Sequence, residues 1–186
     1  MRSSAPFVGL ALLFAAAGMA TQSTEIAPAD NAELARLYQE DQDDRKPAIT
    51  DMDWAVVKPR DDARLKRVKE LYAAGGLQTG SDWLRAAVIL QHGDEPDDFL
   101  LAHEMCIAAI VKGEHKARSM AANTEDRFLR RIGRPQRFGT QWEPGDKPGT
   151  FRIAPTDPAV SDQLRSALGV PTLSELKARE TQFDKK

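Results

Sequence analysis

The residues best suited to chemistry are His92, at the end of a predicted helix, and the neighbours Asp126 and Arg127, which precede a polar loop over 133–141. A histidine titrates near neutral pH and is the commonest general acid or base, so His92 is the first candidate for catalysis. Arg127 is expected to reach a carboxylate such as Asp41 or to clamp an anionic ligand. Asp126 is expected to accept backbone amides of the loop. The alternative is a polar network with a structural role alone.

His103 is the second catalytic candidate, about 9 Å along its own predicted helix from the turn that follows His92. His103 and Glu104 resemble the start of a zinc-protease motif, but Ile107 stands where the second histidine is required. Cys106, the one cysteine, lies in an apolar run, which predicts a buried and unreactive thiol. We therefore predict no metal site and no cofactor.

Glutamines are frequent among the candidate residues. A glutamine amide offers hydrogen-bond donors and acceptors without titrating, which suits recognition of an amide, a peptide bond or a sugar better than covalent catalysis. The sequence contains no Ser-His-Asp order, glycine-rich phosphate loop, paired catalytic carboxylates or CxxC motif. The predicted ligand-binding or structural network comprises Gln42, Arg45, Gln91, Asp126, Arg127, Gln136, Thr140 and Gln141.

Helices that could position these residues are predicted from the spacing of apolar side chains and from glycines and prolines at their ends. The predicted ranges are 31–46, 61–74, 81–92, 97–112 and 117–132. Small residues spaced by four across the fourth and fifth helices predict a closely packed helical hairpin that turns near Gly113. These residues are Ala109, Gly113, Ala117 and Ala121.

The remaining segments predict connections, a hairpin and two short helices. Residues 49–59, flanked by Pro47 and Pro59, predict an extended connection docked by Trp54. Residues 137–142 and 150–153 predict two short strands. A helix is predicted to start at Pro158 with an inward stripe of Val160, Leu164 and Leu168, and a capping box over 172–175 starts the last helix. The predicted fold is mainly α: a single-domain helical bundle of six to seven helices with one short β-hairpin, over residues 30–182.

The first twenty residues are typical of a secretory signal, with Arg2, an apolar run over 7–17 and a small-residue cleavage site that ends at Ala20. The run is shorter than the roughly 20 residues that span a bilayer, so we expect no membrane span after cleavage and a periplasmic or secreted protein. Residues 21–29 are expected to form a flexible leader and 183–186 a frayed tail. The remaining 166 residues carry 25 basic and 28 acidic side chains. This balance lacks the excess of positive charge that is typical of nucleic-acid-binding proteins.

Five short blocks in this order resemble a bacterial family of uncharacterised exported proteins, a domain of unknown function. The blocks are Asp41-Gln42-x-x-Arg45, Gln91-His92-Gly93, Asp97-Asp98-x-x-x-Ala102-His103-Glu104, Asp126-Arg127 and Gly133-x-Pro135-Gln136-x-x-Gly139-Thr140-Gln141. The resemblance extends over about residues 34–173. It implies that these positions matter, but it implies no activity, substrate or cofactor.

Three hypotheses of function follow from the sequence. The favoured one is a binding or interaction module with an amide-rich polar pocket around His92, for a small molecule, a peptide or a protein. The second is a hydrolase that uses His92 as general base, with Arg127 or a loop amide stabilising negative charge. The third is an α-hairpin scaffold built on residues 97–132, for which the chain offers one hairpin and no second copy.

Overall fold

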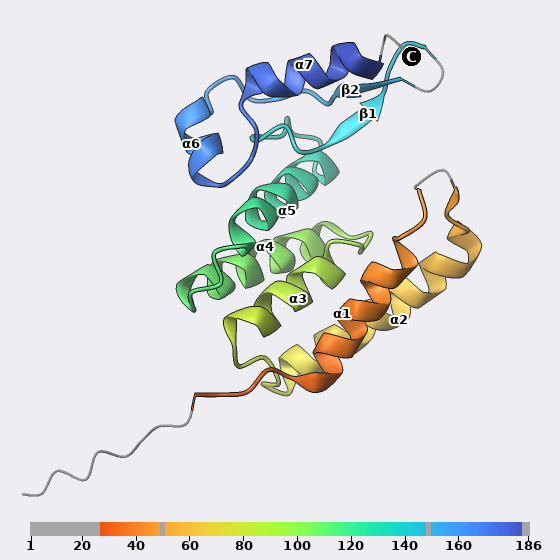
Figure 1. Cartoon of the computed structure of the whole chain (residues 1–186), viewed down its shortest axis with the longest axis vertical. Coiled ribbons are helices and arrows are strands. Elements are labelled where there is room, and N and C mark those ends of the chain that lie inside the picture. Colours follow the sequence, from red (N-terminus) through yellow and green to blue (C-terminus); the bar gives the residue numbers. More distant parts are fainter. Residues whose placement is uncertain (1–26, 49–50, 148–149, 184–186) are drawn as a thin grey trace, which may run out of the picture.

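The computed structural model describes residues 27–48, 51–147 and 150–183 (Figure 1). This part of the chain is mainly helical, with seven helices and one two-stranded antiparallel sheet, as predicted. The elements are α1 (Ala32–Asp44), α2 (Trp54–Ala73), α3 (Gly80–Leu90), α4 (Pro96–Val111), α5 (Ala117–Arg131), β1 (Trp142–Pro144), β2 (Phe151–Ile153), α6 (Asp162–Ala167) and α7 (Leu173–Phe183). The predicted signal segment 1–20 and residues 184–186 of the predicted tail lie outside the described residues, and Phe183 is the last residue of α7.

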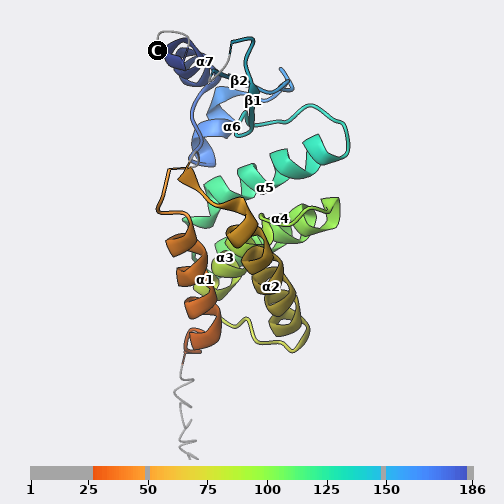
Figure 2. The ribbon, with the colours of Figure 1, turned by 90° about the vertical axis from the view of Figure 1, so that its right-hand side faces the viewer.

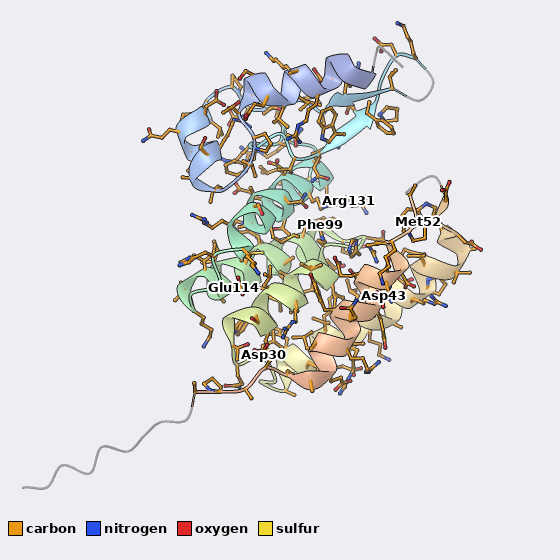
Figure 3. All side chains as sticks on the ribbon, viewed as in Figure 1. Asp30, Asp43, Met52, Phe99, Glu114 and Arg131 are labelled. Atoms are coloured by element: carbon orange, nitrogen blue, oxygen red, sulfur yellow. The ribbon has the colours of Figure 1, made fainter. Side chains whose placement is uncertain are left out.

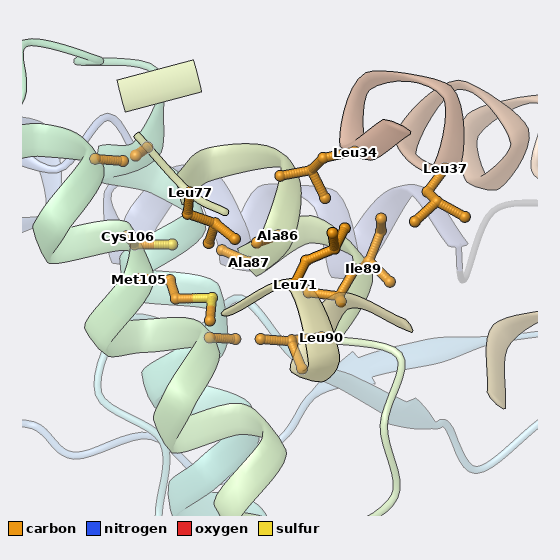
Figure 4. Close-up of a cluster of buried hydrophobic side chains, with 14 of the residues drawn as sticks. Leu34, Leu37, Leu71, Leu77, Ala86, Ala87, Ile89, Leu90, Met105 and Cys106 are labelled. Atoms are coloured by element: carbon orange, nitrogen blue, oxygen red, sulfur yellow. The ribbon is translucent and has the colours of Figure 1, made fainter. Parts of the chain in front are cut away.

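Helix α3 is the central element of the first five helices, because α1, α2 and α4 all pack on it (Figures 1 and 2). The core forms where these helices meet: Leu34 of α1, Leu71 of α2, Ile89 of α3 and Met105 of α4 are buried together (Figure 4). Cys106 is fully buried in the same cluster, and this burial raises the pKa of its thiol to about 12. The predicted unreactive thiol agrees with that environment.

The predicted hairpin of α4 and α5 is confirmed. Ala109, Ala117 and Ala121 are buried between the two helices, and the turn passes through Gly113. Small side chains at these positions allow the two helix backbones to approach closely. The hairpin matters for the site because it holds α5 against α4 and in contact with α3.

The extended connection predicted over 49–59 is wrong in its described part, because α2 already begins at Trp54. Asp53 caps this helix by accepting a hydrogen bond from the backbone N–H of Ala55 at 3.0 Å. Pro59 lies inside the helix, where the bond that it cannot make would have reached a carbonyl of the first turn. Trp54 is not docked in the core: it is 50% exposed. Residues 49 and 50 lie outside the described residues.

The C-terminal part differs from its prediction in two places. Strand β1 begins only at Trp142, because residues 137–141 wrap around a buried carboxylate of α5, and β1 pairs with β2 in the register Trp142 to Ile153. Helix α6 begins at Asp162 and not at Pro158, with Ser161 as its N-cap. Its inward residue is Arg165, which is fully buried, whereas Leu164 of the predicted stripe is 41% exposed.

Replacing the buried arginine of α6 is expected to cost more stability than replacing the leucine beside it. Arg165 donates hydrogen bonds to the backbone carbonyls of Phe138 and Arg137, at 2.5 and 2.9 Å. Arg165→Met leaves both carbonyls without these donors, so we expect the free energy of unfolding to fall by about 2 kcal/mol. Leu164→Ala should change it by less than about 0.5 kcal/mol. Urea denaturation of both variants measures the difference, and equal losses would contradict this assignment of the inward face.

Candidate functional site

A cleft of about 780 Å³ lies where the ends of α1 and α3 meet α2, α4 and α5. In Figure 3, Phe99 and Arg131 lie on the side of α4 and α5, and Met52 lies opposite, beside the start of α2. The lining residues are Arg45, Pro47, Met52, Trp54, Lys58, Asp61, Gln91, His92, Gly93, Asp94, Phe99, Arg127, Arg130, Arg131 and Gln141. The cleft therefore joins residues from α2, α4 and α5, from the segments that follow α1 and α3, and from the loop after α5.

Asp126 fixes the loop that brings Gln141 to the cleft. Its fully buried carboxylate accepts hydrogen bonds from the backbone N–H groups of Arg137, Phe138 and Thr140 at 2.7, 2.9 and 2.9 Å, and from the Thr140 hydroxyl at 2.8 Å. These are the loop amides predicted for Asp126. Gly139 completes the turn with a φ of +74°, and an added Cβ would lie 2.7 Å from Leu176.

Gln136 acts as an internal clamp of the same loop. Its side-chain amide donates to the carbonyls of Gln141 and Ala154 at 2.9 and 2.8 Å, and its carbonyl accepts from the N–H of Gln141 at 2.8 Å. The side chain is fully buried and does not line the cleft. Gln136 and Thr140, both predicted as ligand-binding or structural residues, are thus placed in the support of the site.

Two lining residues, Arg45 and Asp61, belong to a network of ion pairs that joins the end of α1 to α2. Arg45 lies 2.8 Å from a carboxylate oxygen of Asp41 and 2.8 Å from one of Asp61. Arg64 binds the other oxygen of Asp61 at 2.6 Å and Asp44 at 2.8 Å. Asp41, Asp61 and Arg64 are buried, so both carboxylates have their guanidinium partners in a poorly solvated place.

His92 lies at the inner end of the cleft, just beyond α3. Its Nε2 atom is 3.5 Å from Asp41 Oδ1, and this contact is not a hydrogen bond, so Nε2 is buried without a hydrogen-bond partner among the described residues. Burial, and after it the charge of Arg45, lowers the pKa of His92 to about 3. The imidazole is therefore neutral at pH 7. The next residue, Gly93, has no room for a side chain, because an added Cβ would lie 2.3 Å from a carboxylate oxygen of Asp98.

Acid is expected to destabilise the fold through His92. The unfolded chain binds a proton on this residue at a pKa of about 6.5, whereas the folded protein binds it only near pH 3. Linkage then lowers the free energy of unfolding by about 2 kcal/mol between pH 7 and pH 5. Asp41 acts in the opposite direction, because burial raises its pKa and the folded protein binds that proton first. Urea denaturation at pH 7, 6 and 5 measures the slope.

Two variants separate these contributions. In His92→Gln, the decrease in the free energy of unfolding between pH 7 and pH 5 should be smaller by about 2 kcal/mol, because glutamine does not titrate. Asp41→Asn should make it steeper, because the opposing contribution is removed. A His92→Gln protein with the slope of the unchanged chain would show that the pKa of His92 is the same in the folded protein as in the unfolded chain.

Arg127 faces the cleft from α5 and differs from the other cations there. Its Nε donates to Asn123 Oδ1 at 3.0 Å, and no described carboxylate lies within 4.0 Å of its guanidinium, so the predicted contact with Asp41 is wrong. Asp41 is engaged by Arg45 and by the Gln42 amide at 2.8 Å. Burial, and after it the charges of Arg45 and Arg130, lowers the pKa of Arg127.

The cleft brings together only some of the predicted residues. Arg45, Gln91, His92, Arg127 and Gln141 line it. Gln42 is bound to Asp41 outside it. His103 is absent from its walls, because its Nδ1 atom lies 2.9 Å from the carbonyl oxygen of Ala121 and joins α4 to α5.

Several lining residues were not predicted from sequence, namely Met52, Trp54, Lys58, Asp61, Asp94, Phe99, Arg130 and Arg131. For the arginines of α5 a signal existed, since Arg127, Arg130 and Arg131 share one end of the helix. For Met52 and Trp54 none existed, because the start of α2 was predicted as an extended connection.

Within the described ranges, no three His, Cys, Asp or Glu side chains are grouped closely enough to hold a metal ion. No helix of the described chain has the length and apolar character needed to cross a bilayer. Comparisons with family models, curated proteins and solved structures found no match to this chain.

Proposed function

We propose that this chain is an exported binding module whose cleft takes up a ligand with a carboxylate group, held by Arg127. The observation that carries the proposal is that no carboxylate of the described residues pairs with this half-buried guanidinium. Buried charges in proteins are normally paired, and an anionic ligand supplies the missing partner. Because Nε is occupied by Asn123, the two terminal nitrogens are left to bind both oxygens of one carboxylate.

The charge balance of the cleft favours a carboxylate over a doubly charged phosphate. Four of its five cations already have carboxylate partners among the described residues, and Arg127 alone has none. The pairs are Arg45 with Asp41 and Asp61, Lys58 with Asp62 and Asp94, Arg130 with Glu143, and Arg131 with Asp94. One uncompensated positive charge matches one negative charge on the ligand.

Matched pairs of small molecules test this proposal by isothermal titration calorimetry. Each pair consists of a carboxylate and its amide, so the two differ in charge and little in shape. The carboxylate should bind more tightly by about tenfold or more, because a charge-assisted pair is worth more than a neutral hydrogen bond. Equal affinity within every pair would overturn the proposal. Export is tested separately: protein recovered from the periplasm or the medium should begin at Thr21.

A hydrolase is the second candidate, favoured by the 3.5 Å approach of Asp41 to His92. A carboxylate beside an imidazole can orient a general base. The pKa of about 3 weakens this reading, since an imidazole that holds its proton so poorly is a weak base at pH 7. Cleavage of an ester or amide probe that stops in both His92→Gln and Asp41→Asn, with binding retained, would establish the hydrolase.

A further inference from the structure

The side of the cleft opposite α4 and α5 carries two large apolar side chains: Met52, which precedes α2, and Trp54, which begins it. Phe99, a third, lies on the side of α4. Phe99 is 5% exposed and belongs to the packed interior, but Trp54 is 50% exposed. Asp53 already caps α2, so the start of this helix does not require a large aromatic ring. A tryptophan that leaves half its surface in water beside a cleft is suited to stack on a ligand ring.

The two glutamines that line the cleft have side-chain amide atoms that make no hydrogen bond to the described residues. Gln91 makes no side-chain hydrogen bond to the described residues. Gln141 donates from its side chain to the Thr140 hydroxyl at 3.0 Å, which leaves its carbonyl oxygen as an acceptor. Together they offer one donor and one acceptor without a charge, which is the complement of an amide group.

We infer that the ligand is an N-acylated amino acid with an apolar ring, either free or as the C-terminal residue of a peptide. The inference rests on the proposed function, because the carboxylate of this residue pairs with Arg127. Its amide N–H donates to Gln141, its acyl carbonyl accepts from Gln91, and its ring packs on Trp54 and Met52. The cleft of about 780 Å³ is of the size that holds ligands larger than one residue, so the acyl side has room to extend as a peptide.

Tripeptides test the inference directly. The probes are Ala-Ala-Phe with a free C-terminus, its C-terminal amide, Ala-Ala-Gly and N-acetyl-phenylalanine, with binding measured by calorimetry. Tryptophan fluorescence gives a second readout, since Trp54 is the tryptophan that lines the cleft and Trp83 and Trp142 do not. Ala-Ala-Phe should bind about tenfold more tightly than Ala-Ala-Gly and should change the fluorescence.

Variants assign the preference to the ring of Trp54. Trp54→Ala should weaken Ala-Ala-Phe binding about tenfold and leave Ala-Ala-Gly unchanged, whereas Trp54→Phe should retain most of the preference. Val56→Ala is the matched control, because Val56 is 44% exposed on the same helix and does not line the cleft. Circular dichroism checks that each variant is folded.

The outcomes distinguish this inference from the function on which it rests. If the free carboxylate is required but Phe and Gly bind alike, the ring inference is overturned and the carboxylate module stands. If the ring is preferred but amidation has no effect, or if no carboxylate binds, the proposed function is overturned. Equal affinity of N-acetyl-phenylalanine and Ala-Ala-Phe identifies the free amino-acid derivative, and tighter binding of the tripeptide identifies the peptide.

Discussion

Arg127→Met should abolish carboxylate binding without lowering the stability of the fold. The variant removes the guanidinium that has no carboxylate partner in the described part of the chain, and loss of a charge-assisted bidentate pair corresponds to about 100-fold in affinity. The free energy of unfolding should stay the same or rise by up to about 1 kcal/mol, because the cost of holding an unpaired charge out of water disappears. Methionine retains the packing of the aliphatic part of arginine. Calorimetry with a carboxylate probe and urea denaturation measure the two quantities.

Arg130→Met is the matched control, since Arg130 lies on the same helix and lines the same cleft. Its guanidinium already binds Glu143 at 3.4 Å and the Trp142 carbonyl at 3.3 Å. We therefore expect a small change in affinity, of about threefold or less, and no gain in stability. If both variants lose binding equally, the effect comes from the general positive charge of the cleft and not from Arg127.

Asp126→Asn should lower the free energy of unfolding by about 3 to 4 kcal/mol, the largest stability effect that we expect from a single substitution here. The asparagine NH₂ group would face backbone N–H groups that now donate to a carboxylate oxygen, so donors would meet donors inside the fold. Gln141 depends on the same loop, so carboxylate binding should weaken as well. Urea denaturation gives the stability, and calorimetry gives the affinity.

Glu125→Gln provides the comparison for Asp126→Asn. Glu125 is the preceding residue of α5, and its carboxylate pairs with Arg137 at 3.2 Å on a partly exposed surface. Such a pair contributes little, so the loss should be below about 0.5 kcal/mol. A loss for Asp126→Asn that does not exceed the loss for Glu125→Gln would show that the loop holds its shape without the buried carboxylate.

The sequence correctly predicts those helices whose inward faces carry only apolar or small residues. The hairpin of α4 and α5 follows from its spaced alanines, and the ends of helices follow from glycines. Helix α2 was predicted to begin at Asp61 because Pro47 and Pro59 flank the segment before it. Its inward side runs from Val57 through Asp61 and Arg64 to Val68, with charges in its centre, so no continuous apolar face outweighed the prolines. Apolar periodicity cannot find an inward face that is stabilised by ion pairs between helices.

The prediction of the inward face of α6 was wrong for a similar reason. The predicted inward stripe contained Leu164 and not the neighbouring Arg165, because an arginine is rarely fully buried. The carbonyl groups that bind Arg165 belong to Arg137 and Phe138, about 27 residues earlier in the chain. No local pattern contains that partnership, so the inward residue of α6 could not be predicted from its own helix.

The candidate site was predicted in outline. The juxtaposition of His92, Arg127 and Gln141 was expected from sequence, and these residues line one cleft. The expected amide-rich character was not found, because Gln42 and Gln136 are used inside the protein and the cleft is richer in arginine than in glutamine. Whether a glutamine side chain is free for a ligand or is used inside the protein depends on which unpaired groups lie near it in the fold, and a sequence does not show this. The family resemblance stays a prediction.

Asp94 is held from both sides of the cleft mouth, by Lys58 of α2 at 2.8 Å and by Arg131 of α5, whose Nε donates to the Asp94 carbonyl at 2.7 Å. Its side chain is 60% exposed, so dissolved ions can reach the charges that join the two rims. The pairs of Arg45 and Arg64 are more buried, with side chains that are 19% and 6% exposed, and are screened less. Rising ionic strength would therefore loosen the entrance first and leave the base of the cleft in place.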